Sequence, residues 1–162
     1  MDSFRRRIYP SLGDLWRDVQ AILSQRHLLG PERGSVDPAF RERLMLAVTA
    51  VNGCRYCSYV HARHALSEGI SAEEIDLLSE GTFEGSPSDE VPALLYAQHW
   101  AEAEGNPDPA ARASVERVYG ADRLERIELT IKMIRVANLL GNTFDYVLYR
   151  LCLGGGAGAV RE

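Results

Sequence analysis

Helical periodicity recurs along the whole chain, and no stretch alternates convincingly between apolar and polar residues as a strand would. Four residues stand where a helix N-cap is expected, each just before such a segment: Ser11, Asp37, Ser71 and Asp108. Helices are predicted over about residues 12–23, 38–51, 54–68, 72–81, 90–104, 109–119 and 122–151. The sequence therefore predicts an all-α fold.

The length of the chain, 162 residues, suits one domain with a substantial core and is too short for two. We expect a single compact, multi-helical domain over residues 1–162, with its core motif at about residues 38–80. Leu44–Val51 is apolar on nearly every side, so its helix should be central. Residues 154–162 should form a flexible tail, because their glycines follow a helix and open none, unlike a phosphate-binding loop.

Charge and hydropathy indicate where the protein works. The net charge is −5, from 23 acidic and 18 basic residues, so we expect no binding to nucleic acid or to a membrane surface. No apolar run follows Arg5–Arg7 as in a secretory signal, and Leu44–Val51 is far shorter than a span of about 18 residues. The expected compartment is the reducing cytoplasm, where a CxxC pair is catalytic or metal-binding rather than a structural staple.

Three residues whose side chains can react or bind a metal share one predicted helical face: Cys54, Cys57 and His61. On a helix turning about 100° per residue, Cys57 lies about 60° from Cys54, and His61 lies between them. The two Cα atoms would be about 5 Å apart, a distance that permits a disulfide. The pair also lies in the first helical turn, where the helix dipole favours a thiolate.

Lowering a thiol pKa by two units takes about 2.7 kcal/mol of differential stabilisation. A helix terminus supplies about 0.3–1 kcal/mol, and about 2 kcal/mol in partly buried sites. A neighbouring imidazole that accepts the proton could supply the rest. Cys57 has His61 one turn away, whereas Cys54 is two turns away, so the lowered pKa is expected at Cys57.

Other interpretations of the same residues remain open. The cysteines could be two buried apolar side chains, or Cys54, Cys57 and His61 could bind zinc with His64 or Glu42 as fourth ligand. Structural zinc usually draws on two separated ligand pairs, and no second pair exists here. Cys152 is distant from the others, and we expect it to be a small buried side chain.

Two polar features stand near these residues. Glu42 belongs to an Arg-Glu-Arg run that looks solvated, although its helical stripe could point inward. In the last helix a polar stripe is formed by Arg135, Asn138, Asn142 and Asp145. A water-facing edge is the favoured interpretation of that stripe, and a subunit contact or the wall of a pocket is the second.

The spacing Glu42-x11-Cys54-x2-Cys57-x3-His61 resembles the signature of the alkylhydroperoxidase D-like proteins, the redox branch of the carboxymuconolactone decarboxylase superfamily. The resemblance implies an all-α fold and a peroxidase activity toward hydrogen peroxide and organic hydroperoxides. It also implies that Cys57 is oxidised to sulfenic acid, that Cys54 is proton donor and disulfide partner, and that Glu42 and His61 form a proton relay. Tyr56 departs from family peroxidases that carry a histidine there.

The function expected from residues and resemblance together is a thiol peroxidase that cycles between dithiol and disulfide. It would hold no bound cofactor and would be reduced by an external dithiol, such as a lipoyl group on a carrier protein. A general disulfide oxidoreductase or redox sensor without peroxide selectivity, or a zinc-binding module, are the alternatives. The apolar surface of Leu44–Val51 and of the last helix predicts a homo-oligomer, and the resemblance implies a trimer or hexamer.

Overall fold

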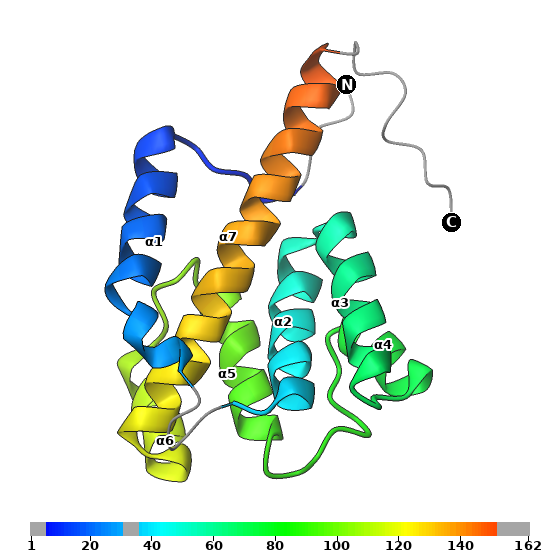
Figure 1. Cartoon of the computed structure of the whole chain (residues 1–162), viewed down its shortest axis with the longest axis vertical. Helices are drawn as coiled ribbons and strands as arrows, with labels where there is room; N and C mark the ends of the chain where they lie inside the picture. Colours follow the sequence, from blue (N-terminus) through cyan, green and yellow to red (C-terminus); the bar gives the residue numbers. More distant parts are fainter. Residues whose placement is uncertain (1–5, 31–35, 152–162) are drawn as a thin grey trace.

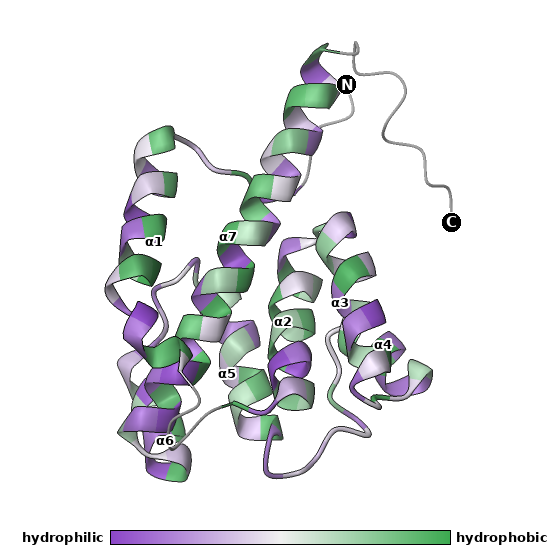
Figure 2. Cartoon of the chain, in the orientation of Figure 1, coloured by the Kyte–Doolittle hydropathy of each residue, from purple (hydrophilic) through white to green (hydrophobic). Residues whose placement is uncertain are grey.

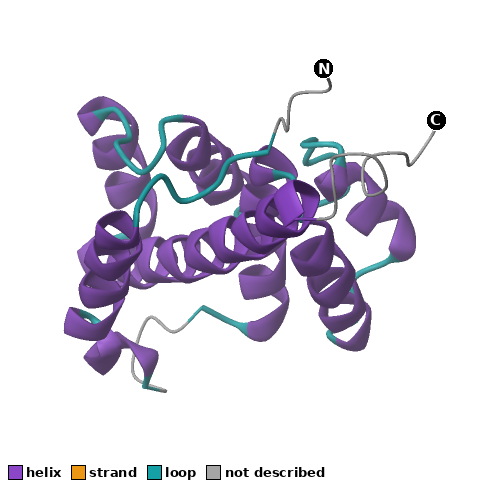
Figure 3. Ribbon diagram, turned by 90° about the horizontal axis from the view of Figure 1, so that it is seen from above, coloured by secondary structure: helices purple, strands orange, loops and turns teal. Residues whose placement is uncertain are grey.

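The computed structural model describes residues 6–30 and 36–151, and in these segments every regular element is a helix (Figures 1 and 3). The elements are α1 (Leu12–Ser24), the 3-10 turn η1 (Arg26–Leu29), α2 (Pro38–Asn52), α3 (Arg55–Ser67), α4 (Ala72–Ser79), α5 (Val91–Glu102), α6 (Pro109–Tyr119) and α7 (Ala121–Leu151). The predicted all-α fold is confirmed. The predicted tail at 154–162 and Cys152 lie outside the described residues.

Local capping explains why the helices begin where the sequence predicts. The Ser11 hydroxyl accepts the Asp14 N–H at 3.1 Å, and the Ser71 hydroxyl accepts the Glu74 N–H at 3.1 Å. At the end of α2, Gly53 adopts a left-handed conformation with φ of 67°, which glycine tolerates best. The chain can therefore turn at once into α3, and this turn holds the ends of the two helices together.

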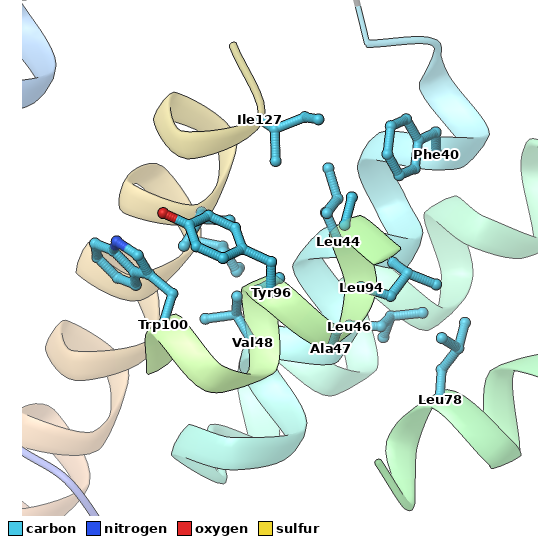
Figure 4. Close-up of a cluster of buried hydrophobic side chains, with 14 of the residues drawn as sticks. Phe40, Leu44, Leu46, Ala47, Val48, Leu78, Leu94, Tyr96, Trp100 and Ile127 are labelled. Carbon is cyan, nitrogen blue, oxygen red and sulfur yellow. The ribbon is translucent and has the colours of Figure 1, made fainter. Parts of the chain in front are cut away.

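Helix α2 is the centre of the structure, as the apolar run Leu44–Val51 predicts. It packs against α3, α4, α5 and α7, so its side chains meet neighbours in nearly every direction. The core that Figure 4 shows is formed around it by residues including Phe40, Leu44, Leu46, Ala47, Val48, Leu78, Leu94, Tyr96, Trp100 and Ile127. Full burial of each large apolar side chain contributes about 1.5–3 kcal/mol relative to exposure, which fixes α2 in place.

In the Arg-Glu-Arg run at the start of α2, Glu42 is buried and Arg43 is largely so, whereas Arg41 stays partly exposed, so the expectation of a solvated run is wrong for Glu42 and Arg43. Arg43 donates to Glu74 at 2.7 Å and to Glu90 at 3.2 Å, which ties α2 to α4 and to the start of α5. Glu42 is only 3% exposed. Charges on a helix with neighbours on every side are buried with a partner, and the local sequence does not show those partners.

None of the helices in the described segments combines the length and the hydropathy that crossing a bilayer requires.

Candidate functional site

The two cysteines lie at the corner where α2 passes into α3. Cys54 is the N-cap of α3 rather than part of its first turn, and its sulfur accepts the Cys57 N–H at 3.4 Å. The two Sγ atoms are 2.8 Å apart, and both cysteines are free. Cys54 is fully buried, whereas Cys57 is half-buried. The pair thus has an inner sulfur and an outer one that a small molecule can approach.

The proton is shared unequally between these sulfurs. The hydrogen bond with Cys57 lowers the pKa of Cys54 to about 6 against the effect of burial, and the backbone N–H groups of Cys57 and Tyr56 add to the lowering. The same hydrogen bond and burial raise the pKa of Cys57, and the Asn138 amide opposes this more weakly. The expectation that Cys57 carries the lowered pKa is therefore wrong. The N-cap position gives Cys54 the helix-terminal donors.

The lowered pKa of Cys54 and the raised pKa of Cys57 predict how the thiol pair ionises as the pH is raised. Titrating the ultraviolet absorbance of thiolate should reveal one thiolate that forms as the pH rises through about 6, because protons leave a group of lowered pKa early. Cys54→Ser should remove this transition, and the remaining Cys57 should titrate nearer the ordinary range of about 8.5. A wild-type titration without ionisation below the ordinary thiol range would contradict the arrangement.

The buried Glu42 and the half-buried His61 form a pair one turn of α3 beyond Cys57, although 19 residues separate them in the sequence. The Glu42 Oε2 and His61 Nδ1 atoms are 2.7 Å apart and join α2 to α3. Burial raises the pKa of Glu42, but the hydrogen bond and charge of His61 outweigh it, so the net shift is downward and the carboxylate stays ionised. The carboxylate fixes the ring, with Nδ1 bonded and Nε2 left to exchange a proton.

A zinc site is not formed by these residues. His61 gives its Nδ1 to Glu42, and His64 is exposed, with its ring centroid 6.2 Å from that of His61. Over the two described segments, no three His, Cys, Asp or Glu side chains converge to hold a metal ion. The arrangement favours acid–base and thiol chemistry over metal binding.

The polar stripe of α7 is buried against α2, so its interpretation as a water-facing edge is wrong. Asn138 is fully buried, where its Oδ1 accepts from Asn52 at 3.2 Å and its Nδ2 donates to Thr49 at 3.0 Å. Asn142 donates to the Asn52 carbonyl at 2.8 Å. Because Asn138 also hydrogen-bonds to Cys57, the stripe is a polar wall behind the thiols.

Asp145 continues this wall toward the first turn of α3. It is 6% exposed and accepts from the Tyr56 hydroxyl at 2.6 Å and from Arg55 at 2.7 Å, and it also pairs with Arg6. Its negative charge opposes ionisation of Cys54, whose pKa stays low nevertheless. In the sequence, the wall of a pocket was the second interpretation of the stripe, after a water-facing edge, and nothing there connected the stripe with the cysteines. The signal in the sequence was a row of polar residues on an otherwise apolar helix, which indicates that this face of the helix has polar partners.

Gly141 leaves room for the inner sulfur. A Cβ atom at this position would lie 2.8 Å from Cys54 Sγ, closer than real contacts allow. Gly141→Ala should keep α7, since alanine is the better helix former by about 1 kcal/mol. It should displace the sulfur and slow disulfide formation by up to about 10²-fold. Thiol titration and oxidation rate are the measurements.

The matched control is Gly13→Ala in α1, where the nearest atom to the new Cβ is Ser11 Oγ at 3.5 Å, an ordinary contact. It should leave both measurements unchanged. Wild-type oxidation kinetics in Gly141→Ala would show that this close approach does not set the position of Cys54.

Comparison with known proteins gives one match. A family model described as the carboxymuconolactone decarboxylase family matches residues 19–103, more than half of the chain. No curated protein and no solved structure matches the chain significantly. The matched region contains Glu42, both cysteines and His61, whereas the polar wall on α7 lies outside it.

Proposed function

The chain belongs to the carboxymuconolactone decarboxylase family, and within it we propose that this protein is a thiol peroxidase that reduces hydrogen peroxide or organic hydroperoxides. The lactone decarboxylases of the superfamily generally lack the cysteine pair. Because the reactive groups of this site are the two thiols, thiol chemistry is favoured over decarboxylation. The observation that carries the proposal is the 2.8 Å approach of a half-buried and a fully buried free sulfur, one helical turn from a His61 that is paired with the buried Glu42.

The cycle begins with one proton leaving the thiol pair. His61, oriented by the Glu42 carboxylate, accepts it at Nε2, directly or through a water. The remaining proton is shared between the sulfurs and rests on Cys57, because Cys54 has the lower pKa. Cys54 is therefore the base nearest to Cys57.

Peroxide reduction follows at the outer sulfur. As Cys57 attacks the terminal peroxide oxygen, its proton passes to Cys54 and the O–O bond breaks. Cys54 gives this proton to the departing alkoxide or hydroxide, so an alcohol or water leaves and Cys57 becomes a sulfenic acid. This assigns proton donation to Cys54 and oxidation to Cys57.

Disulfide formation closes the oxidative half of the cycle. The Cys54 thiolate attacks Cys57 Sγ, the S–O bond breaks, and hydroxide leaves as water with the proton that His61 had taken. In sum, two thiols and one hydroperoxide give a disulfide, an alcohol and water. The sulfurs, 2.8 Å apart, need to approach by less than 1 Å to reach the S–S bond length of about 2.05 Å.

Turnover requires an external dithiol that reopens the disulfide by exchange. A lipoyl group on a carrier protein is the proposed donor, and the reducing cytoplasm is the compartment that maintains such a donor. The reductant attacks the half-buried Cys57, the sulfur that it can reach, and Cys54 leaves as the thiolate of lowered pKa.

A steady-state assay tests the proposal. Purified protein should consume hydrogen peroxide and an organic hydroperoxide in the presence of lipoamide, thioredoxin or a small dithiol, and the Cys57→Ser protein should not. Loss of two thiols to peroxide without turnover under any donor would indicate a redox sensor. Faster exchange with protein disulfides than with peroxides would indicate a general disulfide oxidoreductase. Either result would replace the peroxidase assignment.

A further inference from the structure

A pocket of about 510 Å³ lies open to solvent between α1 and the body of the molecule. Its walls come from α1, from α7, from the C-terminal end of α5 and from the segment before α1. Figure 2 shows hydrophilic and hydrophobic bands along α1 and α7, the two helices that form its long sides. Small-molecule sites have volumes of about 300–1,000 Å³, so this pocket can hold an organic molecule rather than a single ion.

Buried side chains form the floor of the pocket. Trp100 is 6% exposed, and Asn52 and Leu139 are each 3% exposed. Ile8 and Pro10 add apolar surface from the segment before α1. The pocket therefore reaches the core of the molecule, and a ligand in it buries an apolar body against apolar side chains.

Four of the charged side chains around the pocket neutralise one another in pairs. Asp18 of α1 pairs with Arg135 of α7, and Asp14 pairs with Arg17 at 3.0 Å. The Arg135 guanidinium also lies over the Trp100 ring, 5.9 Å from its centroid, which fixes it at the wall of the pocket. These two ion pairs hold α1 and its side chains in place without adding net charge to the pocket.

Two further cations at the pocket have neutral partners. The Lys132 ammonium donates to the Gln25 amide oxygen at 2.9 Å, and the Arg7 guanidinium donates to two backbone carbonyls at the end of α5. With the exposed Glu104 included, four basic and three acidic side chains line the pocket, which leaves one net positive charge. Because the protein as a whole has a net charge of −5, this local excess of positive charge favours a negatively charged ligand.

Lys132 is the side chain best placed to bind the charged group of such a ligand. An ammonium has three N–H donors, and among the described residues only Gln25 accepts from this one, so two donors remain. Leu139 lies seven residues further along α7, about 10 Å away at 1.5 Å per residue. A ligand with its anion at Lys132 therefore has about 10 Å of pocket for an apolar body.

We propose that this pocket binds a monocarboxylate with an apolar body about 10 Å long. The single negative charge of a carboxylate matches the single excess positive charge of the lining, whereas a phosphate ester carries nearly two negative charges at neutral pH. The carboxylate accepts hydrogen bonds from Lys132, and the apolar body lies along α7 toward Leu139 and Trp100.

This binding site is separate from the thiol site. Asn52 lines the pocket and donates to Asn138, and the Asn138 amide hydrogen-bonds to Cys57. Two side chains of the polar wall thus lie between the bound ligand and the outer sulfur. The inference rests on the shape and charge of the pocket and does not depend on the chemistry proposed for the thiols.

Isothermal titration calorimetry with three probes that share one apolar body tests the charge of the ligand. 4-Phenylbutyrate should bind one-to-one with a Kd below about 1 mM. 4-Phenylbutan-1-ol and 4-phenylbutylamine should bind at least about tenfold more weakly, because the alcohol has no charge and the amine adds to the positive charge. Absence of phenylbutyrate binding would overturn the proposal, and so would an alcohol or amine that binds as tightly as the acid.

Two variants test the place of binding, with circular dichroism as the check of the fold. Lys132→Gln can still hydrogen-bond to Gln25 and should weaken phenylbutyrate binding about tenfold or more. Arg117→Gln is its matched control, since Arg117 is exposed on α6 outside the pocket, and it should bind as the wild type does. Ala21→Trp places a large side chain in the pocket from α1 and should abolish binding.

Ala113→Trp is the matched control for Ala21→Trp, because Ala113 is an exposed residue of α6 outside the pocket. It should keep the affinity of the wild type. Wild-type affinity in Lys132→Gln or in a folded Ala21→Trp would place the probe elsewhere on the molecule and overturn the proposal. Equal weakening in a variant and its control would overturn it as well, because the effect would then not come from the pocket.

Discussion

A Cys54→Ser protein given an equimolar amount of hydroperoxide is expected to accumulate a sulfenic acid on Cys57, whereas the Cys57→Ser protein should stay unoxidised. Two properties of the cysteines, the thiol pKa and the access of peroxide to the sulfur, favour different residues as the site of oxidation. The lowered pKa favours reaction at Cys54, but Cys54 is fully buried and Cys57 is half-buried. A thiolate must contact the peroxide oxygen to attack it, so access decides the site and the pKa of Cys54 serves proton transfer.

The measurement is intact and peptide mass spectrometry after trapping with a dimedone-type probe. Oxidation of Cys57 in the Cys54→Ser protein should be slower than in the wild type, because its nearest base is gone and only a few per cent of an ordinary thiol is ionised at neutral pH. The sulfenic acid should persist, because the disulfide partner is absent. Cys152 should stay reduced in both proteins.

Oxidation of Cys54 would contradict this assignment of the two cysteines. If Cys54 is oxidised in the Cys57→Ser protein at the wild-type rate, the inner sulfur is reached by peroxide and the roles of the two cysteines are reversed. The proton path from the thiol pair to His61 and Glu42 would then need to start at Cys54.

The pH dependence of the wild-type reaction follows from the same pair. Below a pH of about 6 both thiols keep their protons, and above it the pair carries one negative charge. The second-order rate with hydrogen peroxide should therefore rise as the pH increases through about 6 and then level. Stopped-flow measurement of thiol loss tests this, and a rate still rising about tenfold per unit above pH 7 would contradict the shared-proton scheme.

The helices were predictable because their signals are local. The N-caps at Ser11, Asp37 and Ser71 hold in the structure, each accepting the N–H three residues on. The break at Gly53 was predictable for the same reason, since a left-handed turn there needs no distant partner. Helix boundaries therefore required no knowledge of tertiary packing.

The arrangement of the site was only partly predictable. Helical spacing placed Cys57 and His61 on one face of α3. Helical spacing could not show that Cys54 would be the N-cap, because the first residue of α3 is set by the conformation of the turn at Gly53. The burial of Asn138 and Asp145 depends on contacts with α2, α3 and the segment before α1, 80 or more residues away in the sequence. Such pairings leave no mark in the local pattern beyond the polar stripe.

Glu42→Gln should slow oxidation of the thiol pair by about 10²-fold or more while leaving the fold intact, the usual scale for loss of a general base. The glutamine is close in shape, but it cannot carry the charge that Glu42 places against His61 at 2.7 Å. His61 then becomes a weaker proton acceptor, and the apparent pKa of the thiol pair should rise. Stopped-flow thiol loss and thiolate titration give the two readouts.

Glu128→Gln provides the matched control, because Glu128 is also a buried acid on a central helix, where it accepts from Tyr96 at 2.7 Å and from Arg112 at 2.9 Å. Its loss should lower thermal stability without changing the thiol chemistry. A general effect of removing buried charge would slow both variants alike. Unchanged rate and thiol titration in Glu42→Gln would instead remove Glu42 from the site. A carboxylate that is 3% exposed would then serve only to join α2 to α3, and the thiol pair would lose its protons directly to water.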